Sequence, residues 1–206
     1  MCVIAVSGRG MRQPTASELE TMFNRNPDGA GYMVARAGQV EIHKGFMCFE
    51  DYWRVIRTER FTEADPVVYH FRISTQAGVN PYMTQPFALT NNLAITEALD
   101  ILAPAGIAHN GIIPATTDPR EKRYSDTALF VAGYLADVAR RPENLDDPKL
   151  RAKLEKLIGW SKLAILYKNG QIATVGHFTQ YNGLLLSNLN HVYSEPVKRY
   201  TFAWNF

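Results

Sequence analysis

The chain has 206 residues, of which 46% are hydrophobic and 20% are charged, and its formal net charge is +2. This composition is typical of a globular protein that buries a sizeable core, and we expect one domain over residues 1–206. The charge gives no reason to expect nucleic acid or a membrane as a partner, and no apolar run is long enough to cross a bilayer. With only Cys2 and Cys48, we expect no disulfide framework, no cysteine-rich metal site and a cytoplasmic location.

The first half of the chain predicts strands and helices in alternation. A capping box at Thr15 to Glu18 opens one of these helices, and Ala37-Gly38 joins a hairpin. The expected strands are residues 2–7, Ala30–Arg36, Val40–Phe46, Pro66–Ile73, Phe87–Thr90 and Leu93–Thr96, with a further strand that runs into residues 108–111. The expected helices are 15–24 and Phe49–Arg60.

The second half repeats this alternation. Ser125 is a predicted N-cap for a helix from Asp126 to about Arg140, and a second helix starts at Asp147-Pro148 and ends at Gly159. The remaining expected strands are Lys162–Lys168 and Gln171–Gly176, which flank an Asn-Gly turn, then Leu184–Ser187 and Tyr200–Trp204. The order of elements along the chain is hairpins, then paired helices, then hairpins again. This order favours an α+β domain of antiparallel sheets with helices packed outside them.

Cys2 is the first residue that suggests chemistry. If Met1 is removed, Cys2 carries both a thiol nucleophile and the terminal amine that can act as its base. The reference pKa of such an amine, about 7.7 to 8.0, suits a general base near neutral pH. On its own, Cys2 is more simply explained as a small buried apolar residue.

Three other segments place unusual polar residues at strand or helix ends. Arg72 leaves an apolar strand, where it can form two charge-assisted hydrogen bonds with a carboxylate or join a surface salt bridge. Asn110-Gly111 is either a tight turn or a pair of donors for an oxyanion. Asp126 follows the predicted cap, and its carboxylate can hold a substrate ammonium group.

These segments together resemble the glutaminase domain of class II glutamine amidotransferases, within the N-terminal nucleophile hydrolases. The resemblance rests on an ordered set of short motifs in most of the first 130 residues. They are Met1-Cys2 entering a strand, Asn26-Pro27-Asp28-Gly29-Ala30-Gly31-Tyr32, His70-Phe71-Arg72-Ile73-Ser74-Thr75, Gln85-Pro86-Phe87, His109-Asn110-Gly111 and Ser125-Asp126-Thr127. Residues 183–188 are also similar to a late strand that in such proteins often ends in Ser-Asn.

The resemblance implies a four-layer αββα sandwich of two mainly antiparallel sheets, the N-terminal nucleophile hydrolase fold. It implies that Cys2 attacks the side-chain amide of glutamine and that Asn110 and Gly111 stabilise the oxyanion. Arg72, helped by Thr75, would hold the α-carboxylate of the substrate, and Asp126 its α-ammonium group. The products would be ammonia and a γ-glutamyl thioester that water hydrolyses, with no cofactor.

Two departures from the family pattern leave alternatives open. Gln85 stands where many members have His, and Gln76-Ala77-Gly78 follows Thr75 where a glycine usually comes earlier, so the substrate loop is expected to differ. No part of the 206 residues remains for a synthase domain, so we expect a stand-alone enzyme that releases ammonia to a separately encoded synthase or ligase, in a bacterial cell or as a phage protein in its host. The alternatives are a hydrolase of another γ-glutamyl amide or peptide and a catalytically silent binding module.

The remaining motifs favour ordinary structural roles. The five histidines are scattered, with no pair at metal-ligand spacing, so we expect no metal site. No glycine-rich phosphate loop is present. Trp53, Trp160 and Trp204 are expected to be packing residues.

Overall fold

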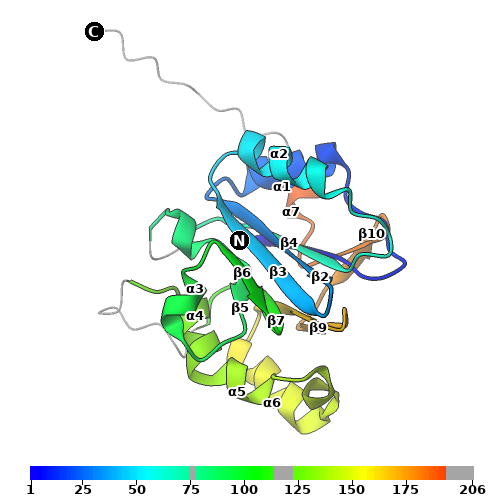
Figure 1. The fold of residues 1–206 in the computed structure, drawn as a ribbon. Coiled ribbons are helices and arrows are strands. Elements are labelled where there is room, and N and C mark those ends of the chain that lie inside the picture. Colours follow the sequence, from blue (N-terminus) through cyan, green and yellow to red (C-terminus); the bar gives the residue numbers. More distant parts are fainter. Residues whose placement is uncertain (75–77, 114–122, 194–206) are drawn as a thin grey trace, which may run out of the picture.

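Two antiparallel sheets lie face to face at the centre of the computed structural model, which describes residues 1–74, 78–113 and 123–193 (Figure 1). The larger sheet has the strand order β10-β11-β1-β4-β2-β3-β6, and the smaller has the order β5-β7-β8-β9. The larger sheet consists of β1 (Val3–Ser7), β2 (Ala30–Arg36), β3 (Gln39–Phe46), β4 (Val67–Phe71), β6 (Asp100–Ala103), β10 (Thr179–Tyr181) and β11 (Leu184–Leu186). The smaller consists of β5 (Phe87–Ala88), β7 (Ala105–Asn110), β8 (Lys162–Tyr167) and β9 (Ile172–Val175).

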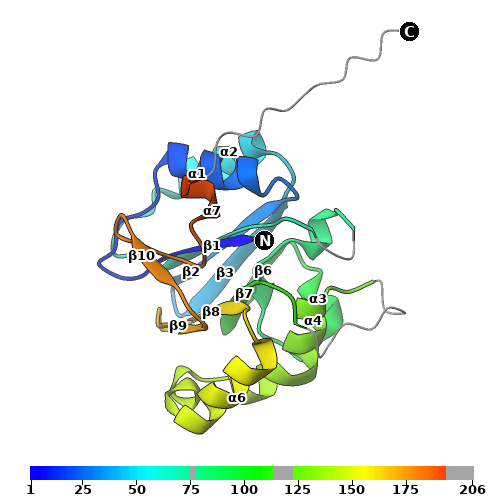
Figure 2. The same ribbon diagram turned by 180° about the vertical axis from the view of Figure 1, so that it is seen from behind.

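Helices cover the outer faces of both sheets and complete four layers, as Figures 1 and 2 show from opposite sides. The larger sheet is covered by α1 (Ala16–Arg25), α2 (Phe49–Glu59) and α7 (Asn190–Tyr193). On the side of the smaller sheet lie α3 (Leu93–Thr96), α4 (Asp126–Phe130), a π-helical turn (Val131–Leu135), α5 (Ala136–Val138) and α6 (Pro148–Ile158). Two short 3-10 helices, Pro81–Met83 and Pro142–Asp146, lie in the connections.

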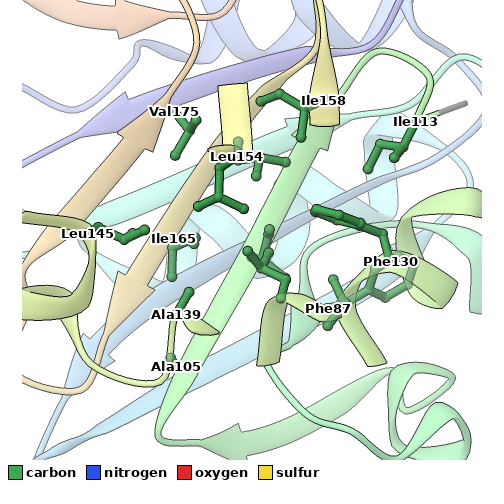
Figure 3. Close-up of a cluster of buried hydrophobic side chains, with 14 of the residues drawn as sticks. Phe87, Ala105, Ile113, Phe130, Ala139, Leu145, Leu154, Ile158, Ile165 and Val175 are labelled. Carbon is green, nitrogen blue, oxygen red and sulfur yellow. The ribbon is translucent and has the colours of Figure 1, made fainter. Parts of the chain in front are cut away.

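Three apolar clusters hold the layers together. The first lies between the larger sheet and its helices and includes Phe23, Tyr52 and Tyr69. Another lies between the smaller sheet and its helices, where Phe130 and Leu154 pack against the strands (Figure 3). The third fills the space between the two sheets. Burial of these apolar side chains is the main favourable contribution to the stability of such a layered domain.

The alternation of side chains along β1 decides which residues face the second sheet. Ile4 and Val6 lie in the cluster between the sheets, whereas Val3 and Ala5 lie in the cluster under the outer helices. Because successive side chains of a strand point to opposite faces, the side chains of Cys2 and Ile4 point to the same face. The nucleophile predicted from the sequence therefore begins a strand on the face that meets the second sheet.

Many sequence predictions of secondary structure are confirmed within one or two residues. Thr15 accepts a hydrogen bond from the N–H of Glu18, and the Glu18 side chain accepts one from the N–H of Thr15, so the predicted capping box starts α1. The β2–β3 hairpin turns at Ala37-Gly38, where both residues have positive φ. The predicted α6 begins at Pro148 and ends before Gly159.

Several element predictions were wrong. The expected strand Leu93–Thr96 is the helix α3, because the side chain of Asn92 caps it by accepting the N–H of Ala94. The expected strand Phe87–Thr90 is only the two residues of β5. The helix expected over 126–140 is present from 126 to 138, and only the π-helical turn Val131–Leu135 within it was not expected. Strands β6 and β10 had no predicted counterpart.

The prediction for one tryptophan was also wrong. Trp160 follows the turn at Gly159 and is 97% exposed, so it is not a packing residue. Trp53 packs against the cluster under α1 and α2. The predicted strand Tyr200–Trp204, with Trp204, lies outside the described residues.

Candidate active site

Cys2 lies at the start of β1, beside the end of β4. Val3 pairs with Phe71 in the antiparallel ladder, so Cys2 comes next to Arg72 and Ile73. Its Sγ is 3.5 Å from the backbone nitrogen of Ile73 and 3.6 Å from the carbonyl oxygen of the same residue. The half-buried thiol is therefore held against the end of a neighbouring strand.

The environment of this thiol favours its neutral form in the resting protein. Burial raises the pKa of Cys2 above its ordinary value, and this is the largest effect. The N–H of Ile73, the terminal positive charge and the Arg72 guanidinium oppose it. A thiol with a raised pKa needs a nearby base in order to react near neutral pH.

Arg72 is a buried cation at the end of β4, with only 6% of its surface exposed. Its Nη2 donates hydrogen bonds to Ser74 Oγ at 3.1 Å and to the carbonyl of Gly78 at 2.9 Å. Burial lowers the pKa of Arg72, and the charges of Cys2, Asp28 and Asp126 oppose this shift. The guanidinium therefore lies among acidic groups from three other segments of the chain.

Asp28 holds the chain that continues from Arg72. Its Oδ2 accepts the N–H of Ser74 at 2.7 Å, and its own N–H donates to the carbonyl of Arg72 at 3.0 Å. These bonds shape the turn just before Thr75, the second carboxylate ligand expected from the resemblance. Thr75 itself lies outside the described residues.

Asn110 ends β7 in the smaller sheet and is fully buried. Its Nδ2 lies 2.9 Å from the Oγ of Ser187, which follows β11 of the larger sheet. The backbone N–H of Ile4 also donates to this Oγ, at 2.9 Å. Asn110 is thereby connected across the two sheets to the strand that begins with Cys2.

Gly111 occupies a position that no other residue type fits well. Its φ is +141°, and a Cβ at this position would overlap with Oγ of Ser161. Ser161 Oγ in turn donates to the carbonyl of Ile112 at 2.9 Å. The chain therefore bends at Gly111, directly after the buried amide of Asn110.

Asp126 is the first residue of α4, and Ser125 caps this helix as predicted by accepting the N–H of Ala128. The carboxylate of Asp126 accepts the N–H of Ile113 at 2.7 Å and the N–H of Thr127 at 2.8 Å. These bonds draw the chain after Gly111 toward the helix N-terminus. Asp126 also contributes to the electrostatic environment of Arg72.

A buried polar network behind these residues was not predicted from the sequence. His109 Nδ1 lies 2.8 Å from Oγ1 of Thr127, and the N–H of His109 donates to Oε1 of Gln85 at 2.6 Å. His70 Nε2 lies 3.1 Å from the carbonyl oxygen of His109 and connects the two sheets. Burial lowers the pKa of His70 to about 3 and that of His109 to about 4, so both rings are neutral at pH 7.

Lys44 is a second residue that the sequence analysis missed. Its Nζ donates to the carbonyls of Tyr82 at 2.7 Å and Thr96 at 2.6 Å, and burial lowers its pKa to about 7. The alternation in β3 was a usable signal, because Val40 and Ile42 on the same face are buried. Lys44 supports the segment that leads to Gln85.

The part of the chain that the structure describes contains neither a metal-binding cluster nor a membrane-spanning helix. In residues 1–74, 78–113 and 123–193 no group of three or more His, Cys, Asp or Glu side chains is placed to hold a metal ion. No helix in this part of the chain combines the length and apolar character needed to cross a membrane.

Comparison with known proteins identifies the fold. No protein-family model and no curated protein matches the sequence. Among solved structures, a glutamine phosphoribosylpyrophosphate amidotransferase from B. subtilis, in complex with ADP and GMP, is similar with a TM-score of 0.56 and 18% identity. A structure described as the allosteric regulatory enzyme of purine biosynthesis is similar with a TM-score of 0.55 and 14% identity.

In both cases the similarity covers 93% of this chain and 42% of the other, so the chain spans less than half the length of the proteins it matches. The expected α+β sandwich of two antiparallel sheets is confirmed, and it is consistent with the N-terminal nucleophile hydrolase fold of these neighbours. The resemblance to glutamine amidotransferases stated from the sequence is thus confirmed at the level of the fold.

Proposed function

We propose that this chain hydrolyses the side-chain amide of glutamine with Cys2 as an N-terminal nucleophile. The observation that carries the proposal is the convergence of four separate segments. Four residues lie close together where β1 and α4 begin and where β4 and β7 end, namely Cys2, Arg72, Asn110 and Asp126. The fold shared with glutamine amidotransferases supports the same reaction class.

The proposed reaction starts with removal of Met1, which makes the amine of Cys2 terminal. The amine accepts the thiol proton, and Sγ forms a bond to the amide carbon of the substrate. Asn110 and the backbone N–H of Gly111 stabilise the oxyanion of the tetrahedral intermediate. As the carbon–nitrogen bond breaks, the protonated amine returns a proton to the leaving nitrogen, which departs as ammonia. Water then hydrolyses the γ-glutamyl thioester to glutamate and the free thiol.

The charges around the site suit an amino acid with two charged ends. In the proposal, the Arg72 guanidinium binds the α-carboxylate, helped by Thr75, and Asp126 binds the α-ammonium group. The three bonds between Asp28, Arg72 and Ser74 keep the carboxylate-binding segment in place. A zwitterionic amino acid would present its carboxylate to the guanidinium and its ammonium group to the carboxylate of Asp126.

The fate of the ammonia is part of the proposal. We propose that residues 1–206 act as one glutaminase domain in the cytoplasm and that a separately encoded synthase or ligase accepts the ammonia. A chain that hydrolyses other γ-glutamyl amides would use the same thioester, so substrate comparison distinguishes this alternative.

The test is glutamine-dependent release of glutamate and ammonia by protein that lacks Met1. We expect Cys2→Ala to abolish both products. Cys48→Ala is the matched control, because Cys48 is also a half-buried thiol but contacts Asp51 in α2, and this variant should keep full activity. Turnover of γ-glutamyl dipeptides with glutamine inert would support the alternative substrate. No turnover of either by processed protein, with its acceptor enzyme present, would favour a silent module.

A further inference from the structure

We propose that Ser187 is a positioning residue that fixes the orientation of the Asn110 side-chain amide, so that its Nδ2 faces the substrate. This inference rests on the proposed function, because it assigns Ser187 a task within the same site. It concerns the protein's own hydrogen bonds, however, and can be tested separately from catalysis.

The position of the Ser187 hydroxyl is fixed by β1. The N–H of Ser187 donates to the carbonyl of Ile4 at 3.0 Å, and the N–H of Ile4 donates to Oγ of Ser187 at 2.9 Å. Ser187 is 3% exposed, so solvent does not compete for this hydroxyl. Its oxygen therefore receives one backbone proton, and its own proton remains to be donated.

The Asn110 amide is the partner that decides where this proton goes. With Nδ2 placed 2.9 Å from Ser187 Oγ, two N–H donors point at the same oxygen. In that arrangement Oδ1 of Asn110 is buried and has no hydrogen-bond partner among the described residues. The contacts found for Ser187 in that part of the chain likewise include no acceptor for its hydroxyl proton.

A half-turn of the amide exchanges the positions of Oδ1 and Nδ2 and gives both the Ser187 proton and Oδ1 a partner, and it leaves Nδ2 as the atom without one among the described residues. The oxygen and nitrogen of an amide are nearly the same size and are assigned from the hydrogen-bond network. After the turn, the Ser187 hydroxyl donates to Oδ1 over the same 2.9 Å. Nδ2 then takes the unpartnered position, where its two protons are available to a substrate oxygen that becomes negatively charged.

The neighbouring residue extends this arrangement to the nucleophile. Asn188 Nδ2 donates to the carbonyl oxygen of Cys2 at 2.7 Å. The pair Ser187-Asn188 thus contacts the residue that carries the thiol and the residue that would stabilise the oxyanion. The end of β11 sets the two relative to one another.

Neutron diffraction on crystals of the perdeuterated protein tests the proposal directly, because it distinguishes oxygen from ND₂ and locates deuterium. We expect deuterium on Ser187 Oγ directed at Asn110, and the two amide deuterons of Asn110 on the far side. An Asn110 deuteron directed at Ser187 Oγ would overturn the proposal. This result does not depend on glutaminase activity.

Binding of an aldehyde analogue of glutamine gives the functional test. The Cys2 thiol adds to the aldehyde carbon and its proton passes to the amine, so the hemithioacetal presents a tetrahedral oxyanion, whereas glutamate forms no tetrahedral adduct with the thiol. We expect Ser187→Ala to weaken binding of the aldehyde and to lower kcat, each by about 10- to 100-fold. This loss is smaller than the ~10²–10³ typical for losing an oxyanion donor. KM and glutamate affinity should change little, and Ser187→Thr should restore most of the loss.

Two comparisons separate positioning from a general structural role. Ser7, at the end of β1, also has a buried hydroxyl, which donates to the carbonyl of Arg12 at 2.7 Å. Ser7→Ala should leave aldehyde affinity unchanged. In an Asn110→Ala background, Ser187→Ala should have little further effect on kcat. Equal losses in both backgrounds, or equal losses of aldehyde and glutamate affinity, would contradict the inference. If the wild-type protein neither binds the aldehyde nor turns over glutamine, the proposed function fails, and the neutron result still decides the Ser187 assignment.

Discussion

The side chain of Asn188 donates a hydrogen bond to the backbone carbonyl of Cys2, with 2.7 Å between Nδ2 and the oxygen. The two residues are 186 positions apart in the chain. Because β11 pairs with β1 in an antiparallel ladder, the end of one strand meets the beginning of the other. The first residues of the chain are thereby held in place by a segment close to the last described helix.

Asn188→Ala should lower kcat for glutamine about five-fold, because one hydrogen bond that orients Cys2 contributes about 1 kcal/mol. Steady-state kinetics measure this effect. Asn144→Ala is the matched control, since Asn144 Nδ2 donates to the carbonyl of Val138 at 2.9 Å, in the helical layer outside the smaller sheet. The control should lose similar stability and no activity. An equal kcat for Asn188→Ala and wild type would argue against an orienting role.

Arg72→Lys should raise KM for glutamine by about 10- to 100-fold, because a lysine keeps the charge but cannot form two parallel hydrogen bonds with a carboxylate. Arg36→Lys supplies the comparison, since Arg36 pairs with Glu59 at the far end of the β2–β3 hairpin and should leave KM unchanged. A KM that is the same for Arg72→Lys and the wild-type protein would exclude the proposed carboxylate contact.

Asp126→Asn should reduce discrimination between glutamine and its analogue that lacks the α-amino group. The wild-type protein is expected to prefer glutamine by about 10-fold or more, because a charge-assisted hydrogen bond to a buried group contributes about 1.5–3 kcal/mol. The ratio of kcat/KM for the two compounds isolates this contact from any general loss of stability. If Asp126→Asn keeps the full preference, another group binds the ammonium.

Gly111→Ala should lower the free energy of unfolding by about 2 kcal/mol or more. The φ of Gly111 is strained for any other residue, and a Cβ at this position would overlap with Ser161. Gly133→Ala should be neutral or stabilising by up to about 1 kcal/mol, since this helical glycine has open space where a Cβ would lie. Urea-induced unfolding of both variants measures the difference. Equal stabilities would show that the turn at Gly111 tolerates a side chain.

Acid should destabilise the fold through its two buried histidines. The folded-state pKa values of His70 and His109 are lowered to about 3 and about 4, below the 6.5 of an unfolded chain. Between pH 6.5 and about 4 the unfolded state therefore binds more protons, and stability falls as pH falls, by at most about 1.4 kcal/mol per pH unit for each ring.

Urea unfolding at pH 7 and pH 5 should show a smaller loss for His70→Gln than for wild type. NMR spectra of the ring C–H groups should report neutral His70 and His109 at pH 5. Titration of both rings near pH 6.5 would contradict this explanation.

Local signals in the sequence were sufficient for most helices and hairpins. The capping box at Thr15, the Ala37-Gly38 turn and Pro148 with Gly159 each depend on backbone geometry within a few residues. Asn92 was a local capping signal of the same kind, but the short apolar run 93–96 after it was interpreted as a strand. Strand β6 forms only because β3 is available to pair with it, which is a non-local condition.

The predicted site residues that the structure describes lie at one end of the sheets, and the ordered motifs were the reason to expect a shared site. The residues that support them were harder to predict. Ser187 and Asn110 are 77 positions apart, and the contacts of His109 with Gln85 and Thr127 depend on how strands and helix pack. Alternation along a strand could have identified Lys44 as buried, but it does not say which carbonyls its ammonium group binds.

The central claim, that Cys2 is an N-terminal nucleophile, is tested most directly by the intact mass of natively expressed protein before and after exposure to an electrophilic glutamine analogue. We predict a mass without Met1 and a single adduct on the N-terminal peptide, which is lost in Cys2→Ser and retained in Cys48→Ala. Retention of Met1 with no adduct, or an adduct that persists in Cys2→Ser, would contradict the claim.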